Sequence, residues 1–377
     1  MMVQFKNIVI FIISLSVLLA CNKQQSNSIV SPRTYRMGFQ NSAPRPDFNL
    51  YVQSLNLWST RADAAMISVQ LPWDSLLAGV TPQTYITNNY SGVVNYWRDK
   101  NFKLWVYVDP ENGLDRSSDA PILVANNKSI AQTPIQQLYR NYVIAIDTML
   151  HPEHLGFALE TNLIKGAAPD SIYQGIKLAA NEASADVRAV DAQVKFGISV
   201  QVEYAWGKLG GTGSYVGVNQ DFIDFPFIQE LGLSSYPYFA FNEPSDVPLD
   251  YYSRLVIGRS APVFASEGGW TSSNLNESGT IINSTPQEQE DYINRQSLIL
   301  DSAKAIGLFS LTFTDIDLSA IPANTPADIN YFAYLGLVDS NLQPKPALSA
   351  WDAIFKRPLK CEGEKNGCLF AITNANQ

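Results

Sequence analysis

The sequence predicts a single α/β domain folded as a (β/α)8 TIM barrel, on three observations. Short apolar segments rich in β-branched residues alternate eight times with longer helical patterns, as in a parallel sheet with crossover helices. These segments are apolar almost throughout, which is typical of strands buried on both faces. About 340 residues follow the N-terminal region, a length that suits one barrel with insertions. An open doubly wound sheet would show the same alternation, but the number of units favours the closed barrel.

Residues 1–20 have the pattern of a secretory signal peptide. Lys6 precedes an apolar run over residues 8–19, which is too short for a stable membrane span. The run ends in Leu18-Leu19-Ala20-Cys21, which resembles the lipobox of bacterial lipoproteins. The resemblance implies that Cys21 carries a diacylglycerol and becomes the mature N-terminus. An ordinary cleavage site with an incidental cysteine is the alternative.

Polar segments flank the expected barrel of residues 34–358. Residues 21–33 are rich in Gln, Ser and Asn and predict a tether, and Asn22 resembles an outer-membrane retention signal. We therefore expect an exported protein, anchored by its lipid to a bacterial membrane, at the outer membrane or the cell surface. The tail of residues 359–377 holds Cys361 and Cys368, an even pair that predicts one small disulfide. A reduced, unpaired state is the alternative.

The apolar runs define the expected strands, and two helices have explicit start signals. Thr285 and Glu288 have the spacing of a capping box around Pro286. Asp170 opens a long segment whose apolar residues recur at helical spacing. The expected strands are Tyr35–Phe39, Ala64–Leu71, Lys103–Val108, His154–Glu160, Lys195–Gln201, Gly232–Tyr236, Pro262–Glu267 and Gly307–Thr314.

Charge and composition disfavour several classes of protein. The net charge is -9 and Lys and Arg form no stripe, which argues against a nucleic-acid partner. No glycine-rich phosphate loop follows the first strand, so a nucleotide cofactor has no support. The only two histidines, His151 and His154, precede the fourth strand, at the end of a barrel opposite its active site. A Ser-His-Asp triad, a Cys-His pair and a histidine zinc site are therefore disfavoured, and we expect no metal and no cofactor.

Two glutamates stand where the expected strands end. Glu160 closes the fourth strand and Glu267 the seventh. A carboxylate at the C-terminal end of a barrel strand points into the barrel mouth, where it is costly to place unless a function uses it. Paired carboxylates suit glycoside cleavage, because one protonates the leaving oxygen while the other stabilises or attacks the oxocarbenium-like centre.

Three segments resemble glycoside hydrolase clan A over the range Tyr35–Trp351. Ser266-Glu267-Gly268-Gly269-Trp270 resembles the strand-seven nucleophile segment of this clan. Ser234-Ser235-Tyr236-Pro237-Tyr238 is similar to the strand-six segment of endo-β-1,4-galactanases and their relatives. Residues 334–339 and 344–347 resemble the closing segment after strand eight. The resemblance implies that Glu267 is the nucleophile and Glu160 the general acid/base.

The chain departs from the clan pattern at two places. Clan members usually have Asn before the acid/base, where it holds the sugar 2-hydroxyl, but this chain has Leu159. Asn162, two residues after Glu160, is the candidate to replace that contact. Phe313 is the weak substitute for the usual strand-eight Trp. These departures leave open an altered substrate, or a barrel that binds glycan without cutting it.

Other aromatic residues are candidates for binding the substrate. The resemblance implies that Tyr236 hydrogen-bonds the nucleophile, with Tyr238 lying against it. Trp206 and Trp270 lie just beyond strand ends and are candidates for stacking on a sugar ring, with a core position as the alternative for both. We expect the core to contain Trp58, Trp97, Trp105 and Trp351.

Further carboxylates follow the strands and are rivals for lining the sugar subsites. Asp115 and Arg116, in the turn-rich loop after strand three, are expected as a surface pair. The rival carboxylates are Asp109, Glu203, Asp315 and Asp317.

The sequence thus favours a monomeric, surface-anchored, retaining β-glycoside hydrolase. Its expected substrate is a polysaccharide or oligosaccharide, and galactan-type substrates are the first to test. One alternative is a non-catalytic glycan-binding lipoprotein on a glycosidase-like barrel. Another is a structural or adhesion lipoprotein, in which side chains would fill the mouth of the barrel.

Overall fold

The computed structural model describes residues 31–111, 113–210, 213–277, 279–323 and 325–360. The compact body of the chain begins at Pro32. The expected signal peptide, the lipidation site Cys21 and the pair Cys361 and Cys368 lie outside the described residues. Within these residues, no helix is both long and apolar enough to cross a membrane.

Eight parallel strands form one sheet in the order β1-β10-β7-β6-β5-β4-β3-β2. The sheet closes where β1 meets β2: Asp63 N donates to Met37 O over 2.9 Å and Asn41 N to Met66 O over 3.2 Å. This closure confirms the predicted barrel. The strands are β1 (Arg36–Phe39), β2 (Ala64–Gln70), β3 (Lys103–Asp109), β4 (His154–Gly156), β5 (Lys195–Gln201), β6 (Glu230–Ser235), β7 (Val263–Gly268) and β10 (Gly307–Ser310).

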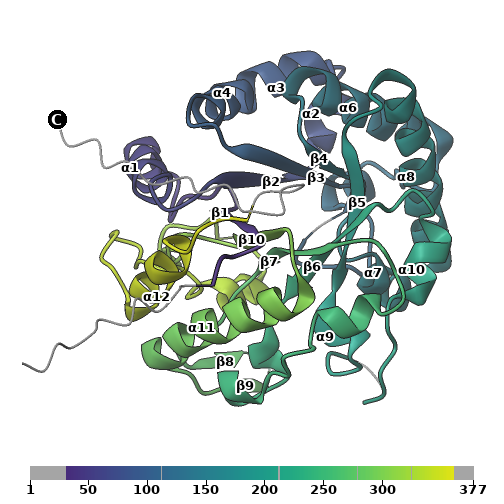
Figure 1. The fold of residues 1–377 in the computed structure, drawn as a ribbon. Helices are drawn as coiled ribbons and strands as arrows, with labels where there is room; N and C mark the ends of the chain where they lie inside the picture. The colour runs from purple at the N-terminus through teal and green to yellow at the C-terminus, as the bar shows by residue number, and fades with distance from the viewer. Residues whose placement is uncertain (1–30, 112, 211–212, 278, 324, 361–377) are drawn as a thin grey trace, which may run out of the picture. The chain divides into compact units, whose positions relative to one another are not determined.

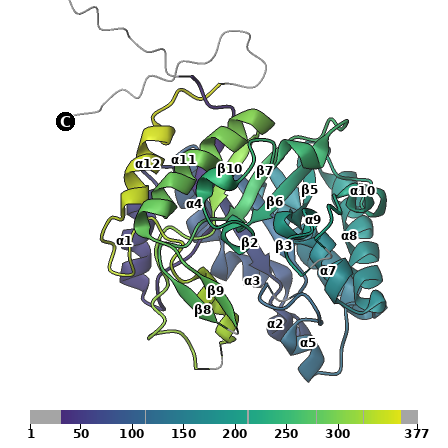
Figure 2. The same ribbon diagram turned by 90° about the horizontal axis from the view of Figure 1, so that it is seen from below.

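Helices surround the strands, as Figures 1 and 2 show. The barrel mouth carries the hairpin of β8 (Leu275–Glu277) and β9 (Thr280–Ile282) and several 3-10 turns, among them η1 (Pro237–Phe239) and η4 (Ala327–Phe332). The α-helices are α1 (Phe48–Trp58), α2 (Trp73–Leu77), α3 (Pro82–Asn89), α4 (Ser91–Asp99), α5 (Pro121–Ala125), α6 (Thr133–Leu150), α7 (Thr161–Ala167), α8 (Asp170–Val190), α9 (Val202–Ala205), α10 (Asn219–Asp224), α11 (Pro286–Ala303) and α12 (Pro346–Phe355).

Both predicted helix starts are confirmed. Helix α8 begins at Asp170. Helix α11 begins at Pro286, and its cap Thr285 accepts a hydrogen bond from Glu288 N at 3.2 Å. Glu288 does not reach back to the cap nitrogen; its carboxylate accepts from the Thr285 hydroxyl at 2.9 Å instead. The local sequence therefore fixes where this helix begins.

Strand β4 is shorter than expected, and this difference positions the candidate site. It ends at Gly156, and the chain continues irregularly beside β5 through Phe157 N to Gly197 O at 3.0 Å. Glu160 is then left-handed, with φ 48°, at the start of α7. Strand β10 likewise ends at Ser310 rather than at Thr314.

Side chains fill the lower half of the barrel interior, the half that lies away from the C-terminal ends of the strands. Trp105, Tyr107, Phe264 and Phe309 pack there as one apolar cluster, which Leu159 joins from above. Gly156 is required beside them, because an added Cβ would lie 2.0 Å from the Tyr107 ring. The packed lower half confines any ligand to the C-terminal ends of the strands.

The histidines lie where the sequence predicted, at the lower end of β4. His154 stacks on Trp105 with ring centroids 3.7 Å apart, and its Nδ1 lies 2.6 Å from Glu230 Oε2. Glu230 also accepts from the Tyr107 hydroxyl at 3.2 Å. His154 is therefore a structural residue at the barrel end opposite the mouth.

Candidate active site

A cavity of about 800 Å³ opens at the C-terminal ends of the strands. This volume is within the roughly 300–1,000 Å³ that is usual for small-molecule sites. Side chains from strand ends form its floor: Gln40, Ser68, Gln70, Asp109, Glu160, Gln201, Glu267 and Thr312. A structural or adhesion protein was expected to have side chains filling the mouth of the barrel, and the open cavity contradicts this expectation.

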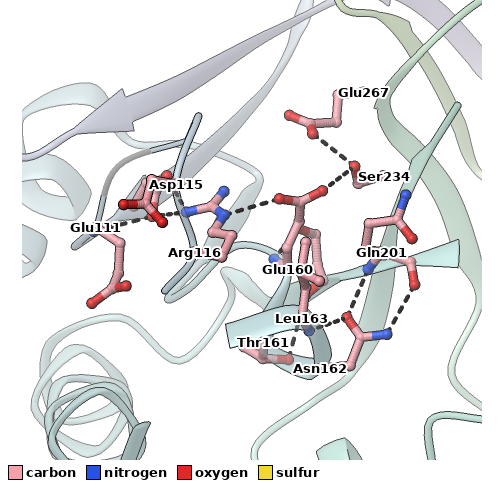
Figure 3. Close-up of polar contacts among 12 residues, drawn as sticks. Glu111, Asp115, Arg116, Glu160, Thr161, Asn162, Leu163, Gln201, Ser234 and Glu267 are labelled. Carbon is pink, nitrogen blue, oxygen red and sulfur yellow. Dashed lines mark hydrogen bonds and ion pairs between the residues drawn. The ribbon is translucent and has the colours of Figure 1, made fainter. Parts of the chain in front are cut away.

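Glu160 is held by two contacts from opposite sides. Its backbone N donates to Ser199 Oγ at 3.0 Å, which fixes the left-handed turn into α7. Its carboxylate is buried, and Oε2 accepts from Arg116 Nε at 2.9 Å. Nη1 of Arg116 also binds both oxygens of Asp109, at 2.8 and 2.9 Å. Figure 3 shows the Arg116 guanidinium joined to Glu160 by a dashed line.

Ser234, at the end of β6, joins Glu160 to Glu267. Its Oγ lies 2.6 Å from Glu160 Oε1 and 2.7 Å from Glu267 Oε1 (Figure 3). Tyr236 OH donates to the same oxygen of Glu267 at 3.3 Å, and Gln40 Nε2 donates to its Oε2 at 3.5 Å. The two glutamates, of which Glu160 follows β4 and Glu267 lies in β7, are thus contacted by residues at the ends of β1 and β6.

The bridge through Ser234 limits the distance between the two carboxyl groups. The two Oε1 atoms cannot be further apart than the sum of the two contacts to Ser234 Oγ, about 5.3 Å. Retaining glycosidases separate their carboxyl groups by about 5 to 5.5 Å, and inverting ones by about 6.5 to 9.5 Å. The bound on these two nearest oxygens is compatible with the separation found in retaining enzymes.

The same bridge indicates that the pair of glutamates holds a proton. A serine hydroxyl has a single hydrogen, so it donates to only one of two carboxylates at once. The second short contact is favourable when the other carboxyl is protonated and donates to Ser234. Consistent with this, burial and then the negative charge of Glu160 raise the pKa of Glu267 to about 7.

Tyr236 is the one predicted substrate-binding residue that lines the described part of the cavity. Its hydroxyl contacts Glu267, as the resemblance implied. Burial, with the nearby charges of Glu267 and Glu160, raises the pKa of Tyr236 well above its ordinary value. The phenol therefore stays a neutral hydrogen-bond donor to Glu267.

Asn162 does not take the place of the clan Asn. Its Nδ2 donates to Gln201 O at 2.9 Å, and its Oδ1 accepts from Gln201 N at 2.8 Å. The amide therefore ties the first turn of α7 to β5, and Asn162 is not among the described lining residues. The suggested contact with a sugar 2-hydroxyl is thus corrected, because both ends of the amide are occupied by backbone.

The four other aromatic candidates lie away from the cavity. Trp206 stacks on Tyr251 with ring centroids 5.0 Å apart and donates to its carbonyl at 3.0 Å. Trp270 is buried beneath the mouth and donates to Ser284 Oγ at 3.0 Å.

Tyr238 and Phe313 are buried as well. Tyr238 OH donates to Tyr331 O at 3.0 Å, and Phe313 packs edge-on against Phe39 at 5.1 Å. All four residues are core or loop supports, so the expected sugar-stacking roles of the two tryptophans and the floor role of Phe313 are not supported. Trp58, Trp97, Trp105 and Trp351 are core, as predicted.

Two of the rival carboxylates hold the loops of the mouth in place. Glu203 is fully buried and accepts from Ser235, Tyr251 and the Tyr236 backbone at 3.0 to 3.1 Å. Asp315 pairs with Lys345 at 2.7 Å.

Asp317 and Asp109 have different surroundings. Asp317 pairs with Arg45 at 3.0 Å. Asp109 does line the cavity, bound to Arg116. The expected surface pair of Asp115 and Arg116 is wrong: Arg116 is buried, and Asp115 accepts from Ser117 and Ser118.

Arg116 and Ser234 are parts of the site that the sequence did not predict. Ser234 carried a usable signal, since it ends a strand within the strand-six segment, where side chains point into the mouth. Arg116 lies in an irregular loop with no periodic pattern, so only the fold brings it to Glu160. Among the described residues, no group of three or more His, Cys, Asp or Glu has the arrangement of a metal site.

No protein-family model and no curated protein matches this sequence. Solved structures do match. An exo-β-1,4-mannosidase from Opitutaceae bacterium strain TAV5 superposes with a TM-score of 0.64 at 15% identity, covering 86% of this chain and 60% of that chain. A β-glucuronidase from Ruminococcus gnavus superposes with a TM-score of 0.54 at 15% identity, covering 86% and 50%. This chain has the barrel of these glycosidases. It spans about half to three fifths of their lengths.

Proposed function

We propose that the protein is a retaining β-glycoside hydrolase that uses Glu160 and Glu267. The observation that carries the proposal is the Ser234 bridge, which keeps the two Oε1 atoms within about 5.3 Å. In the proposed mechanism, Glu267 attacks the anomeric carbon while Glu160 protonates the leaving oxygen, which gives a glycosyl ester on Glu267. Glu160 then takes a proton from water, which attacks the same carbon and frees Glu267.

The mechanism needs Glu160 protonated and Glu267 ionised, whereas burial favours the protonated form of Glu267 in the free site. Burial, and next the negative charge of Glu160, raise the pKa of Glu267 to about 7, and Arg116 Nε lies 2.9 Å from Glu160 Oε2. Ser234 provides the exchange: Glu267 gives its proton to Oγ as Ser234 gives its own to Glu160. One proton leaves and one arrives at Ser234, so the net change is a proton moved from nucleophile to acid.

The charges around the cavity favour a neutral sugar. Besides the two glutamates, its described lining includes Asp109, Asp115 and Asp328. Arg116 is the single Lys or Arg among those residues, and its charge is already paired with two carboxylates. A uronic acid would therefore meet net negative charge, in contrast to what the matched β-glucuronidases accept by their names.

Hydrolysis of matched glycosides tests the proposal. Aryl β-glycosides of glucose, galactose, mannose and glucuronic acid are assayed with the wild type, Glu160→Gln and Glu267→Gln, alongside galactan and other β-linked polysaccharides. We expect cleavage of at least one neutral glycoside, a loss of at least a hundredfold in each variant, and near wild-type rates in the control Glu277→Gln, a residue of β8 that is not among the described lining residues. Activity that survives in both glutamine variants, or absent activity in the wild type, would overturn it.

Non-catalytic glycan binding is the second candidate, and Leu159 is the observation that favours it. Leu159 is buried against Trp105 and Tyr107, so no amide holds a sugar hydroxyl next to Glu160. A binding protein would retain neutral glycosides with unchanged affinity in Glu267→Gln. Calorimetric binding without hydrolysis by the wild type would favour this candidate.

We further propose that the protein is exported and anchored through a lipid on Cys21. The sequence pattern Leu18-Leu19-Ala20-Cys21 supports this. In a bacterial host, the wild type should enter the detergent phase on Triton X-114 partition and Cys21→Ser should not. Equal partition of both proteins into the aqueous phase would contradict the anchor.

A further inference from the structure

We propose that the group released from the sugar is apolar, so that the natural substrate is a glycoside of a hydrophobic alcohol rather than a longer glycan. This inference rests on the proposed function and adds the chemical class of the leaving group. It follows from a difference within the cavity: the strand ends contribute polar side chains, whereas the surrounding loops contribute a group of apolar ones.

The floor of the cavity has the groups that a sugar ring needs. Ser68 and Gln70 point the same way from β2, and Gln40 and Thr312 follow β1 and β10. Among the described residues, Ser68 Oγ and Thr312 Oγ1 have no hydrogen-bond partner. Buried hydroxyls without partners are unfavourable, and sugar hydroxyls would satisfy them. The sugar that contacts the glutamates therefore fits here.

The loops above this floor contribute an apolar wall of six residues from five separate segments of the chain, next to polar lining residues such as Asp115, Ser117 and Thr280. Each of its six residues is half-buried and lines the cavity. They are Leu163 in α7, Leu209 after α9, Phe239 in η1, Ile316 after β10, and Ile329 and Phe332 in η4. Apolar side chains from loops that are distant in sequence thus line the same open cavity.

A wall of this kind suits an alkyl or polycyclic group better than a second sugar. None of the seven tryptophans is among the described residues that line the cavity, although indole rings are good surfaces for sugar rings. Aliphatic side chains offer a sugar no hydrogen bonds and would leave its hydroxyls unpaired. They gain free energy by covering an apolar ligand, and contiguous exposed apolar surface is a marker of a binding site.

Paired alkyl glycosides test the inference with leaving alcohols of similar chemistry. Methyl and octyl β-glycosides of glucose, galactose and mannose are compared, with octyl compounds below their micelle concentration, and the β-1,4-linked disaccharide of each sugar is the third arm. We expect kcat/KM for the octyl compound to exceed that for the methyl compound by about tenfold or more, since burying two methylenes suffices for that. We also expect tighter binding of the octyl compound than of the disaccharide.

Variants assign the effect to the wall. Ile329→Asn should reduce the octyl-to-methyl ratio severalfold, and the matched control Ile257→Asn, whose side chain is 78% exposed outside the cavity, should leave it unchanged. An octyl-to-methyl ratio near one, a ratio insensitive to Ile329→Asn, or stronger binding of the disaccharide would overturn the inference while the hydrolase activity stands.

Binding measurements without hydrolysis distinguish a failure of this inference from a failure of the proposed function. Calorimetry with Glu267→Gln measures the affinities of the methyl, octyl and disaccharide ligands without hydrolysis. If the wild type hydrolyses no glycoside, the proposed function fails, and an octyl preference that Ile329→Asn removes still supports an apolar subsite. Equal affinities for methyl and octyl ligands overturn that subsite in either case.

Discussion

Arg116 Nε lies 2.9 Å from Glu160 Oε2, and both side chains of this ion pair are buried. Because the other edge of the guanidinium binds Asp109, one cation balances two buried carboxylates. Removing one partner of such a pair leaves an uncompensated buried charge. Through Arg116, the loop after β3 is part of the candidate site.

Arg116→Met should destabilise the protein by roughly 3 to 5 kcal/mol, the usual cost of breaking a buried ion pair. It should also raise the pKa of Glu267 further, because the positive charge of Arg116 lowers that pKa in the wild type. Urea unfolding at pH 7 checks the first effect and the pH profile of activity the second. Arg140→Met, which removes an arginine from partly exposed pairs, is the control and should cost under about 1 kcal/mol per pair. Equal losses in the two variants would contradict a special role for Arg116.

Ser234→Ala should lower kcat by roughly tenfold to a hundredfold, since it removes the only described atom that contacts both carboxyl groups. Ser234→Thr keeps the hydroxyl and should retain most of the activity. Ser266→Ala is the matched control, because its hydroxyl is buried beside Glu267 and has no partner among the described residues. A relay role predicts an altered pH profile in Ser234→Ala. Loss of stability with unchanged kcat would indicate a structural role only.

Activity should fall as the pH rises above about 7. Burial and Glu160 raise the pKa of Glu267 to about 7, so the pair keeps one shared proton below that pH and loses it above. Without that proton no acid is available for the leaving oxygen. The pH profile of kcat/KM with an unactivated glycoside measures this limb. A 2,4-dinitrophenyl glycoside, whose leaving group needs no protonation, should show a weaker dependence, and identical profiles would contradict the assignment.

Glu111→Gln should stabilise the protein at alkaline pH and have little effect near pH 4. Burial, and next the charge of Asp109, raise the pKa of Glu111 from 4.5 to about 9, and its carboxyl has no hydrogen-bond partner among the described residues. A raised folded-state pKa gives a contribution to stability that is fully present below the unfolded value and is lost as pH rises through 9. At about 1.4 kcal/mol per pKa unit, the wild type should therefore lose several kcal/mol, up to about 6, relative to the variant between pH 4 and 9. Glu277→Gln, on the β8 strand, is the control, and parallel stability curves for wild type and Glu111→Gln would refute the prediction.

A 2-deoxy-2-fluoro β-glycoside with a dinitrophenol leaving group should trap the glycosyl intermediate on Glu267. The fluorine slows the release of the sugar more than the attack on it, so the ester accumulates. Peptide mass spectrometry locates the added sugar. A label on Glu160 would contradict the assignment and would reverse the two roles.

The strand pattern made most of the barrel predictable, because buried parallel strands read as continuous apolar runs. It also placed Glu160 and Glu267 correctly at the mouth, since strand ends define that position. The pattern could not show that Trp206 and Trp270 turn inward, because both lie in loops where burial depends on partners such as Tyr251 and Ser284. Arg116 was misplaced for a related reason: a loop of turn-forming residues gives no sign that it folds back over the cavity.

The hydrogen bonds between Asn162 and Gln201 make the position of Glu160 depend on the position of α7. Two hydrogen bonds fix the first turn of this helix to β5, and the glutamate is its neighbour at the helix start. The Asn162 amide, which the sequence predicted as a sugar contact, instead fixes the position of Glu160. A change at Asn162 should therefore affect every glycoside by the same factor and leave the preference among sugars untouched.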